Sequence, residues 1–247
     1  MRDRSAPRIP AQTVISNQKK AVVLSAPASG KTMLASYFAL MLCGTTQSDP
    51  SQIGLTKEDD YLPVVVRIRD WILQPNMGLL DYLRSNAEAS LACKELPTGF
   101  FEYWLDRGRA LILLDGLDEV VDEAQRRKVA AQIETFLHQY QDNPAVITSR
   151  PAGYRRDFFN LDEFPHYTLE SFDDKQVATF IDHWYDSRLK NDSAQTDRRK
   201  ADLQKAFARN ERIRLLAKNP LLLTIIALIH RYQAELPRQR CKLIAIE

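Results

Sequence analysis

The sequence predicts an α/β fold in which a parallel sheet is flanked by helices and is followed by a small all-α helical domain. Over residues 21–170, short apolar runs typical of buried strands alternate with helical patterns, which implies a parallel sheet with right-handed crossovers. Beyond Phe172 the strand signals stop and only helical patterns follow. We therefore expect a lead-in over residues 1–20, a sheet domain over 21–171 and a helical domain over 172–247.

Five apolar runs are expected to form the strands. The second run is rich in β-branched residues, and Pro63 near its beginning suits a strand start. The third run, Ala110–Leu114, is apolar throughout and suits a strand buried on both faces. Asn143-Pro144 is a turn signal that introduces the fourth run. The five runs are residues 21–24, 62–68, 110–114, 145–148 and 167–169.

Helices are expected between and after these strands. Apolar residues recur at helical spacing over residues 122–140, so this helix should cover the sheet while Arg126, Arg127 and Lys128 face elsewhere. Residues 44–60 are expected to form a polar loop. The helical segments are residues 33–42, 78–88, 99–107, 122–140, 173–188, 200–209, 211–218 and 220–232.

The segment after the first strand has the pattern of a phosphate-binding loop. It reads Ser25-Ala26-Pro27-Ala28-Ser29-Gly30-Lys31-Thr32. In such a loop, consecutive backbone N–H groups surround the β-phosphate of a nucleotide at the N-terminus of the following helix. Lys31 is then expected to reach the β- and γ-phosphates, and the Thr32 hydroxyl to bind Mg²⁺. The match is imperfect, because Ser25 stands where the pattern has glycine.

A second motif follows the third strand, which ends in Asp115-Gly116-Leu117-Asp118-Glu119. The carboxyl ends of parallel strands face the crevice in which open α/β folds bind their ligands. Asp115 is the expected carboxylate for Mg²⁺, directly or through water, and Asp118 or Glu119 is expected to polarise an attacking water. The alternative is an acidic surface turn without a ligand.

These motifs resemble those of NACHT domains, which are P-loop NTPases of the STAND signalling class. The segment 113–120 looks like the Walker B signature of the family, and 146–154 is similar to its sensor segment. Residues 169–174, followed by 180–185, look like the entry to its helical domain. Residues 216–223 match a proline-containing motif that packs near the adenine in the family.

The resemblance implies an ATP-binding switch with the P-loop NTPase fold. It implies ATP and Mg²⁺ as cofactors and places Pro220 near the adenine. It also supports Arg150, just beyond the fourth strand, as a sensor of the γ-phosphate through charge-assisted hydrogen bonds. From the residues alone, Arg150 could instead pair with a nearby acid, and Pro220 could simply begin a helix, where its missing N–H costs little. The family controls oligomerisation in immune or stress signalling, including bacterial antiphage defence, so self-association or contact with partner STAND domains is expected.

Composition narrows the class of protein. The 247 residues are 45% hydrophobic and carry a formal net charge of +2, which argues against an obligatory nucleic-acid binder. The apolar stretch Leu221–Ile229 is shorter than the roughly 20 residues of a membrane helix. Residues 1–8 lack the apolar core of a secretory signal, so a cytoplasmic location is expected. Cys43, Cys93 and Cys241 show no metal-binding spacing and are expected as free thiols in or near the core.

Two functions from different classes fit these motifs. The first is a slow ATPase in which Mg²⁺-ATP bridges the sheet and helical domains, biases their orientation and is then hydrolysed to ADP. The second is a non-hydrolysing nucleotide-binding assembly module, or a fragment of a larger STAND protein, since the winged-helix and sensor domains usual in that class are absent from the sequence. A P-loop kinase acting on a small molecule fits less well, because no acceptor pocket or lid can be identified.

Overall fold

The structure, a computed structural model, describes residues 8–16, 18–44, 48–56, 60–74, 76–91, 96–188 and 193–232. These residues form two compact units. The first unit contains the described residues up to 26 and from 31 to 169. The second contains residues 27–30 and the described residues from 170 onwards.

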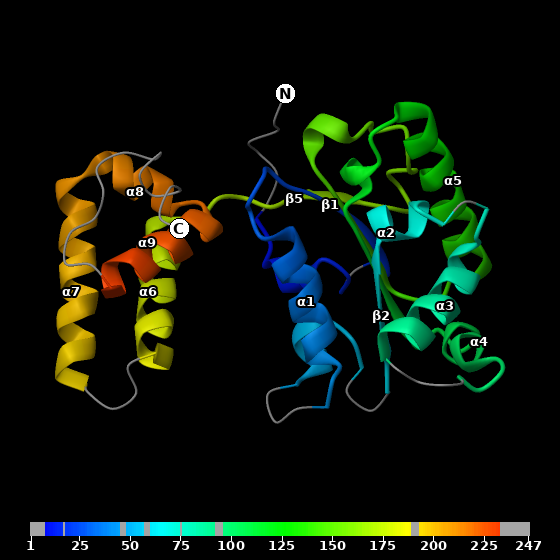
Figure 1. Ribbon diagram of the computed structural model, residues 1–247, viewed down its shortest axis with the longest axis horizontal. Helices are drawn as coiled ribbons and strands as arrows, with labels where there is room; N and C mark the ends of the chain where they lie inside the picture. The colour runs from blue at the N-terminus through cyan, green and yellow to red at the C-terminus, as the bar shows by residue number, and fades with distance from the viewer. Residues whose placement is uncertain are drawn as a thin grey trace. The chain divides into compact units, whose positions relative to one another are not determined.

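A five-stranded parallel sheet forms the centre of the first unit, in the order β2-β3-β4-β1-β5 (Figure 1). Since β4 lies between β1 and β3, the segments that follow these three strands leave the same edge of the sheet next to one another. All five expected strands are present, with ends shifted by one residue at most. The strands are β1 (Lys20–Leu24), β2 (Leu62–Arg67), β3 (Ala110–Asp115), β4 (Ala145–Ser149) and β5 (His166–Thr168).

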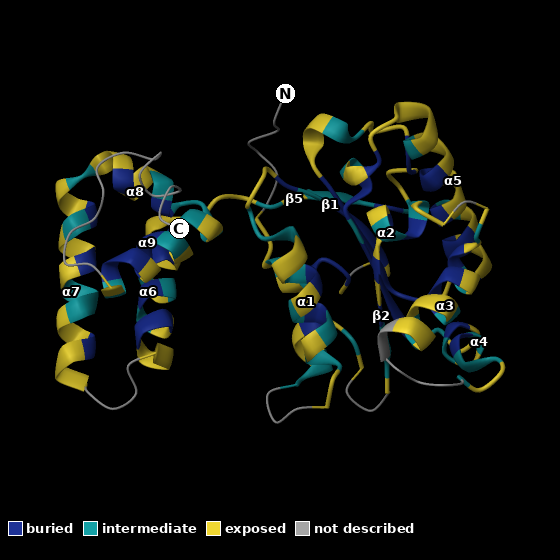
Figure 2. Cartoon of the chain, in the orientation of Figure 1, coloured by how far each residue is buried: buried dark blue, intermediate teal, exposed yellow. Residues whose placement is uncertain are grey.

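Helices cover both faces of this sheet (Figure 1). On one face lies α1 (Lys31–Met41), and on the other lie α3 (Leu79–Leu91), α4 (Phe100–Leu105) and α5 (Glu123–Gln139). Alternate residues of β1 point to opposite faces of the sheet. Val23 packs with Phe38 of α1, whereas Val22 belongs to the core beneath α3, α4 and α5. The three central strands, β1, β3 and β4, are buried on both sides (Figure 2). This double burial explains the unbroken apolar sequence of β3 and confirms the predicted fold class.

Two short elements differ from the sequence expectations. Ile68, expected to end the second strand, instead begins α2 (Ile68–Ile72) and is fully buried. Within the expected polar loop over residues 44–60, a 3-10 helix (η2, Pro50–Ile53) is capped by the side chain of Asp49 and buries Ile53 completely. In both cases the burial of one apolar residue against distant parts of the chain decides the local structure.

A buried asparagine holds the start of β3. The Nδ2 of Asn143 donates to Leu105 O at 2.7 Å and to Tyr140 O at 3.1 Å, while its Oδ1 accepts from Ala110 N at 2.9 Å. The side-chain amide therefore joins the ends of α4 and α5 to the first residue of the strand. With both its oxygen and its nitrogen paired, it satisfies backbone groups that burial would otherwise leave unpaired.

The expectation for the basic residues at the start of α5 is wrong in one position. Arg127 and Lys128 are exposed, as the pattern predicts, but Arg126 is half-buried. It lies one turn before Val129 and Ala130, which belong to the buried stripe of the helix. Arg126 therefore continues that stripe instead of facing elsewhere.

Cys43 is a free thiol, as expected, but the expectation that it lies in or near the core is wrong. Cys43 is exposed just beyond the end of α1, and its Sγ donates to Ala39 O at 3.2 Å. The chain leaves the helix at this point, and the described residues leave the thiol exposed. Cys93 and Cys241 lie outside the described residues.

The second unit consists of helices packed around one apolar core (Figure 2). The helix α7 begins at Ser193, before the expected residue 200. The sequence pattern does not indicate this start, because the first turns are polar and carry no apolar periodicity. None of the helices in the described part of the chain is both long and apolar enough to cross a membrane. The helices are α6 (Asp174–Arg188), α7 (Ser193–Arg209), α8 (Glu211–Ala217) and α9 (Pro220–Tyr232).

A buried hydrogen bond joins α6 to α9. The hydroxyl of Tyr185 lies 2.7 Å from Nδ1 of His230. Burial lowers the pKa of His230; the positive charge of Arg199 lowers it further, and Asp202 partly opposes this. Burial raises the pKa of Tyr185 to about 12, so at neutral pH a protonated hydroxyl shares this hydrogen bond with a neutral imidazole.

We expect the helical unit to lose stability as the pH falls below the ordinary histidine pKa of 6.5. The unfolded chain takes up a proton at His230 near that pH, whereas the folded chain does so only at lower pH, so protonation favours unfolding. In urea unfolding followed by circular dichroism, the midpoint should fall less in His230→Gln than in wild type between about pH 7 and about pH 5.5. His183→Gln, which changes an exposed histidine of α6, should behave like wild type. Equal losses in His230→Gln and wild type would contradict the assignment.

Candidate nucleotide-binding site

The predicted phosphate loop connects β1 to α1. Ser25 and Ala26 follow the strand, residues 27–30 form the turn, and Lys31 begins the helix. Gly30 has a φ of 97°, in the left-handed region that favours glycine, and Ala28 has a φ of 63°. Ser25 does not share this conformation, so a side chain at that position is compatible with the turn. Ser25, the departure from the usual pattern, therefore causes no backbone strain, whereas Ala28 adopts a left-handed conformation that is unfavourable for a residue with a Cβ.

Ser25 is completely buried where β1 meets the loop. Its backbone N–H donates to Ser149 O, at 3.1 Å, and so continues the pairing of β1 with β4 for one residue beyond the strand. Among the described residues its hydroxyl oxygen has no hydrogen-bond partner. The loop is thus fixed to the end of β4 at its first residue.

Thr32 and Asp115, the two predicted magnesium ligands, are in direct contact. The Thr32 hydroxyl donates to Asp115 Oδ2 at 2.8 Å. The other carboxylate oxygen accepts from the Thr148 hydroxyl, which itself accepts from Gly116 N–H at 3.1 Å. Hydroxyl and carboxylate oxygens are the ligands that Mg²⁺ prefers, so these residues fit that ion. Thr148 orients the carboxylate and is a site residue that the sequence reasoning missed; its signal is a polar side chain inside an apolar strand.

The carboxylate of Asp118 contacts two cations. Lys31 Nζ lies 3.1 Å from Oδ1, and Arg150 Nε lies 3.0 Å from Oδ2. The backbone N–H of Arg150 also donates to Oδ1, at 2.8 Å. Only 8% of the Asp118 side chain and 13% of the Lys31 side chain are exposed, so water weakens the contact between them less than in a surface ion pair. The structure thus brings three predicted site residues from three loops to one point.

Glu119 has a different environment. It closes the 3-10 helix η3 (Leu117–Glu119), which follows the left-handed Gly116. Its side chain is 40% exposed, and its Oε2 lies 3.6 Å from Nε of Arg69, too far for a hydrogen bond. Of the two candidates for polarising water, Glu119 has the accessible carboxylate, whereas both oxygens of Asp118 are already in ion pairs, Oδ1 with Lys31 and Oδ2 with Arg150.

The segment that follows β4 is anchored beyond Arg150. It forms the 3-10 helix η4 (Pro151–Gly153), after which the hydroxyl of Tyr154 hydrogen-bonds Nε2 of His166 in β5. Nδ1 of His166 lies 2.7 Å from Phe164 O, to which it donates. Burial lowers the pKa of His166 and raises the pKa of Tyr154, so the tyrosine donates to a neutral imidazole. No local sequence pattern indicates this pair.

Pro220, the residue predicted to lie near the adenine, belongs to the second unit. It is the first residue of α9, and the preceding Asn219 accepts from Leu222 N–H at 3.1 Å through its side chain. The predicted helix start is therefore confirmed. A role toward the nucleotide stays a prediction.

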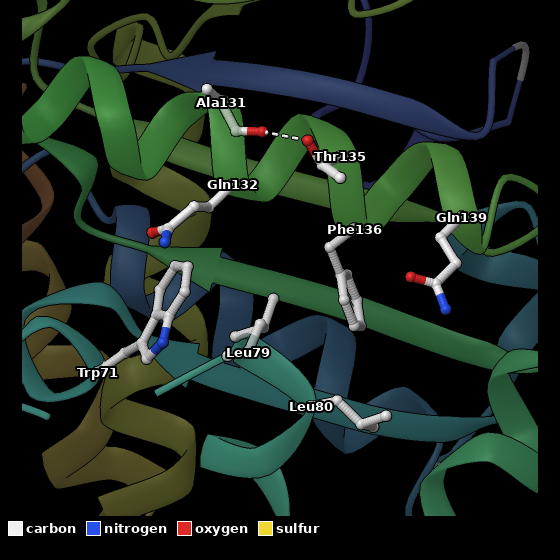
Figure 3. Close-up of a pocket in the computed structure, with 9 residues that line it drawn as sticks. Trp71, Leu79, Leu80, Ala131, Gln132, Thr135, Phe136 and Gln139 are labelled. Carbon is white, nitrogen blue, oxygen red and sulfur yellow. Dashed lines mark hydrogen bonds between the residues drawn. The ribbon is translucent and has the colours of Figure 1, made fainter. Parts of the chain in front are cut away.

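A separate groove of about 390 Å³ lies between α5 and the chain around α2 and α3 (Figure 3). Trp71 and Leu79 line it from one side, and Gln132 and Phe136 of α5 line it from the other (Figure 3). None of the predicted site residues lines this groove. The groove is therefore not part of the candidate nucleotide site.

The sequence matches the model of one protein family, the NACHT domain, over residues 22–188, about two thirds of the chain. The chain belongs to the NACHT domain family. This match confirms the family that the motifs predicted. Because NACHT domains are P-loop NTPases, the chain is a nucleotide-binding domain of that type.

Among solved structures, the chain is similar to a Signal Transduction ATPase with Numerous Domains (STAND) protein with a tetratricopeptide repeat sensor from Pyrococcus horikoshii. The sequence identity is 17% and the TM-score 0.45, with 97% of this chain and 32% of that chain covered. This NACHT domain therefore spans about a third of the length of that protein. No curated protein matches the sequence at a significant level.

We expect Thr148→Val to raise the Mg²⁺ concentration needed for half-maximal nucleotide binding by about 10-fold. A loss of this size is typical when the partner that orients a metal ligand is removed. Valine keeps the shape of the strand residue but cannot hold the carboxylate of Asp115. Mg²⁺ titration of the protein at a fixed nucleotide concentration measures the effect. Thr135→Val is the matched control, because that exposed hydroxyl donates only to Ala131 O of its own helix. An unchanged Mg²⁺ midpoint in Thr148→Val would contradict the role.

Proposed function

We propose that this NACHT domain binds Mg²⁺-ATP, hydrolyses it slowly and uses the state of the nucleotide to control its conformation or self-association. One observation carries the proposal. Lys31 and Arg150 meet at Asp118, on the edge of the sheet where Thr32 contacts Asp115. Two cations suited to phosphate oxygens and two oxygen ligands suited to a divalent metal therefore lie side by side.

Each residue has a separate role in this proposal. Lys31 binds oxygens of the β- and γ-phosphates. Thr32 and Asp115 would hold Mg²⁺, which would offset the negative charge of the phosphates. Arg150 donates charge-assisted hydrogen bonds to the γ-phosphate. Glu119 accepts a hydrogen bond from the attacking water, since its carboxylate is the accessible one.

A nucleotide switch needs a contact that differs between its two states, because a ligand shifts an equilibrium only by its difference in affinity for them. Arg150 supplies that difference, as ATP has a γ-phosphate and ADP does not. Pro220, near the adenine, would connect nucleotide binding to the helical domain. Self-association or contact with partner STAND domains, a part in immune or stress signalling and a cytoplasmic location follow from the family resemblance and the composition, and they stay predictions.

Calorimetric titration with ATP and with a non-hydrolysable analogue, each with Mg²⁺, tests the proposal when phosphate release is then measured on the same sample. Saturable binding with slow release would support the switch. Binding without release would favour the non-hydrolysing assembly module. Absence of binding to either nucleotide would contradict both functions.

We expect Lys31→Ala to weaken triphosphate binding by about 100-fold, because each hydrogen bond to a charged group contributes about 1.5–3 kcal/mol. Calorimetry with the non-hydrolysable analogue measures the loss. Lys19→Ala serves as the control, since Lys19 is an exposed lysine that pairs with Asp142 away from the loop. Wild-type affinity in Lys31→Ala would show that this residue does not contact the phosphates.

We expect Glu119→Gln to keep the affinity for ATP but to lower kcat by about 100-fold, within the range for loss of a general base. The amide has the same shape but cannot accept the proton of water. Phosphate release under saturating ATP measures kcat. Glu123→Gln, an exposed carboxylate at the start of α5, is the control. If turnover stays unchanged in Glu119→Gln, the water is polarised by another group.

A further inference from the structure

Arg126 joins the two segments that carry the predicted catalytic residues. Its Nε and Nη2 both donate to Val120 O, at 2.9 and 2.6 Å, and its Nη1 donates to Gly153 O at 2.7 Å. Val120 directly follows Glu119, and Gly153 closes the 3-10 helix that begins after Arg150. One guanidinium therefore connects the turn after β3 to the turn after β4.

The position is an unfavourable one for a cation. Arg126 lies in the first turns of α5, whose N-cap is Asp122, and the helix dipole disfavours positive charge there. The contacts with backbone carbonyls, which include Val121 O at 3.3 Å, offset that cost. The planar guanidinium can donate to two separated carbonyls at once, whereas the ammonium group of lysine is a compact point charge.

The two connected turns are packed closely together. A Cβ placed on Gly153 would lie 3.1 Å from Asp118 Cβ and 3.5 Å from Arg126 Cζ. The Arg150 N–H donates to Asp118 Oδ1 across the same boundary. A shift of either turn would therefore change the distance between Arg150 and the acidic residues after β3.

We infer that Arg126 is a positioning residue for the γ-phosphate end of the site. It acts through the backbone of the two turns and sets how Arg150 and Glu119 are placed relative to Lys31. It thereby controls hydrolysis and the preference for ATP over ADP, while overall nucleotide affinity depends on the phosphate loop. A misplacement of about 1 Å can cost about 100-fold in rate. This inference rests on the proposed function.

Arg126→Lys and Arg126→Gln test the inference, with Arg127→Gln as the matched control on the neighbouring, exposed arginine that pairs with Asp157. In both Arg126 variants we expect kcat to fall by about 10-fold or more while KM stays within about 3-fold, since neither side chain reaches both carbonyls. The ratio of affinities for the non-hydrolysable ATP analogue and ADP should fall toward one. Arg127→Gln should match wild type in every measurement.

Hydrogen exchange of the nucleotide-free protein provides an independent measurement. The amide of Arg150 reports on the contact between the two turns, because it donates to Asp118. The amide of Gly153 donates to Arg150 O and reports on the turn after β4 itself. Both should exchange about 10-fold faster in Arg126→Gln than in Arg127→Gln, as expected when local opening becomes easier. Amides of β1 and β4 should be unaffected.

The outcomes separate this inference from the proposed function. A purely structural role would lower the thermal midpoint and the folded fraction but leave kcat per folded molecule and the ATP-to-ADP preference unchanged, and that result would overturn the inference. Wild-type kinetics and exchange in Arg126→Gln would also overturn it and leave the proposed function intact. If the wild-type protein itself binds no nucleotide, the proposed function fails and this inference fails with it.

Discussion

The order of the strands is the constraint on which the candidate site depends. Because β4 lies between β1 and β3, the loops after these three strands leave the sheet side by side. Lys31 and Asp118, 87 residues apart in sequence, therefore meet, and Arg150 approaches the same carboxylate from the strand between them. A different strand order would leave the same residue types at separate places on the sheet. The side chains of Lys31 and Asp118 are nearly buried, so their charges interact more strongly than charges on an open surface.

The two ends of the site are held in different ways. At the end proposed to hold Mg²⁺, Asp115 belongs to β3, and Thr148 of the adjacent strand fixes its orientation, so the position of the carboxylate follows from the sheet itself. At the other end, Glu119 and Arg150 belong to short turns. The placement of these turns depends on the hydrogen bonds that the Arg126 side chain donates to their backbone carbonyls. A NACHT domain that distinguishes ATP from ADP needs a contact that can change, and turns of this kind can move more readily than strands within a sheet.

Much of the candidate site followed from the sequence because its motifs are local. A phosphate loop after one strand and acidic residues after another predicted that Thr32 and Asp115 would lie together, and they do. The sequence left Asp118 and Glu119 as equal candidates for the same role, since both follow the strand within a few residues. Only the positions of Lys31 and Arg150 separate them, and those positions are set by the pairing of strands that are far apart in the chain.

The sequence by itself determined the fold class, the five strands, the helical second domain and the family of this protein. These depend on apolar periodicity, turn residues and short motifs, all of which are read from neighbouring residues. Tertiary structure alone decided that Ile68 begins a helix, that Ile53 is buried, that Arg126 continues the buried stripe of α5 and that Cys43 is exposed. Each of these outcomes depends on which distant residues cover a side chain or accept its hydrogen bonds, and a local pattern does not contain that information.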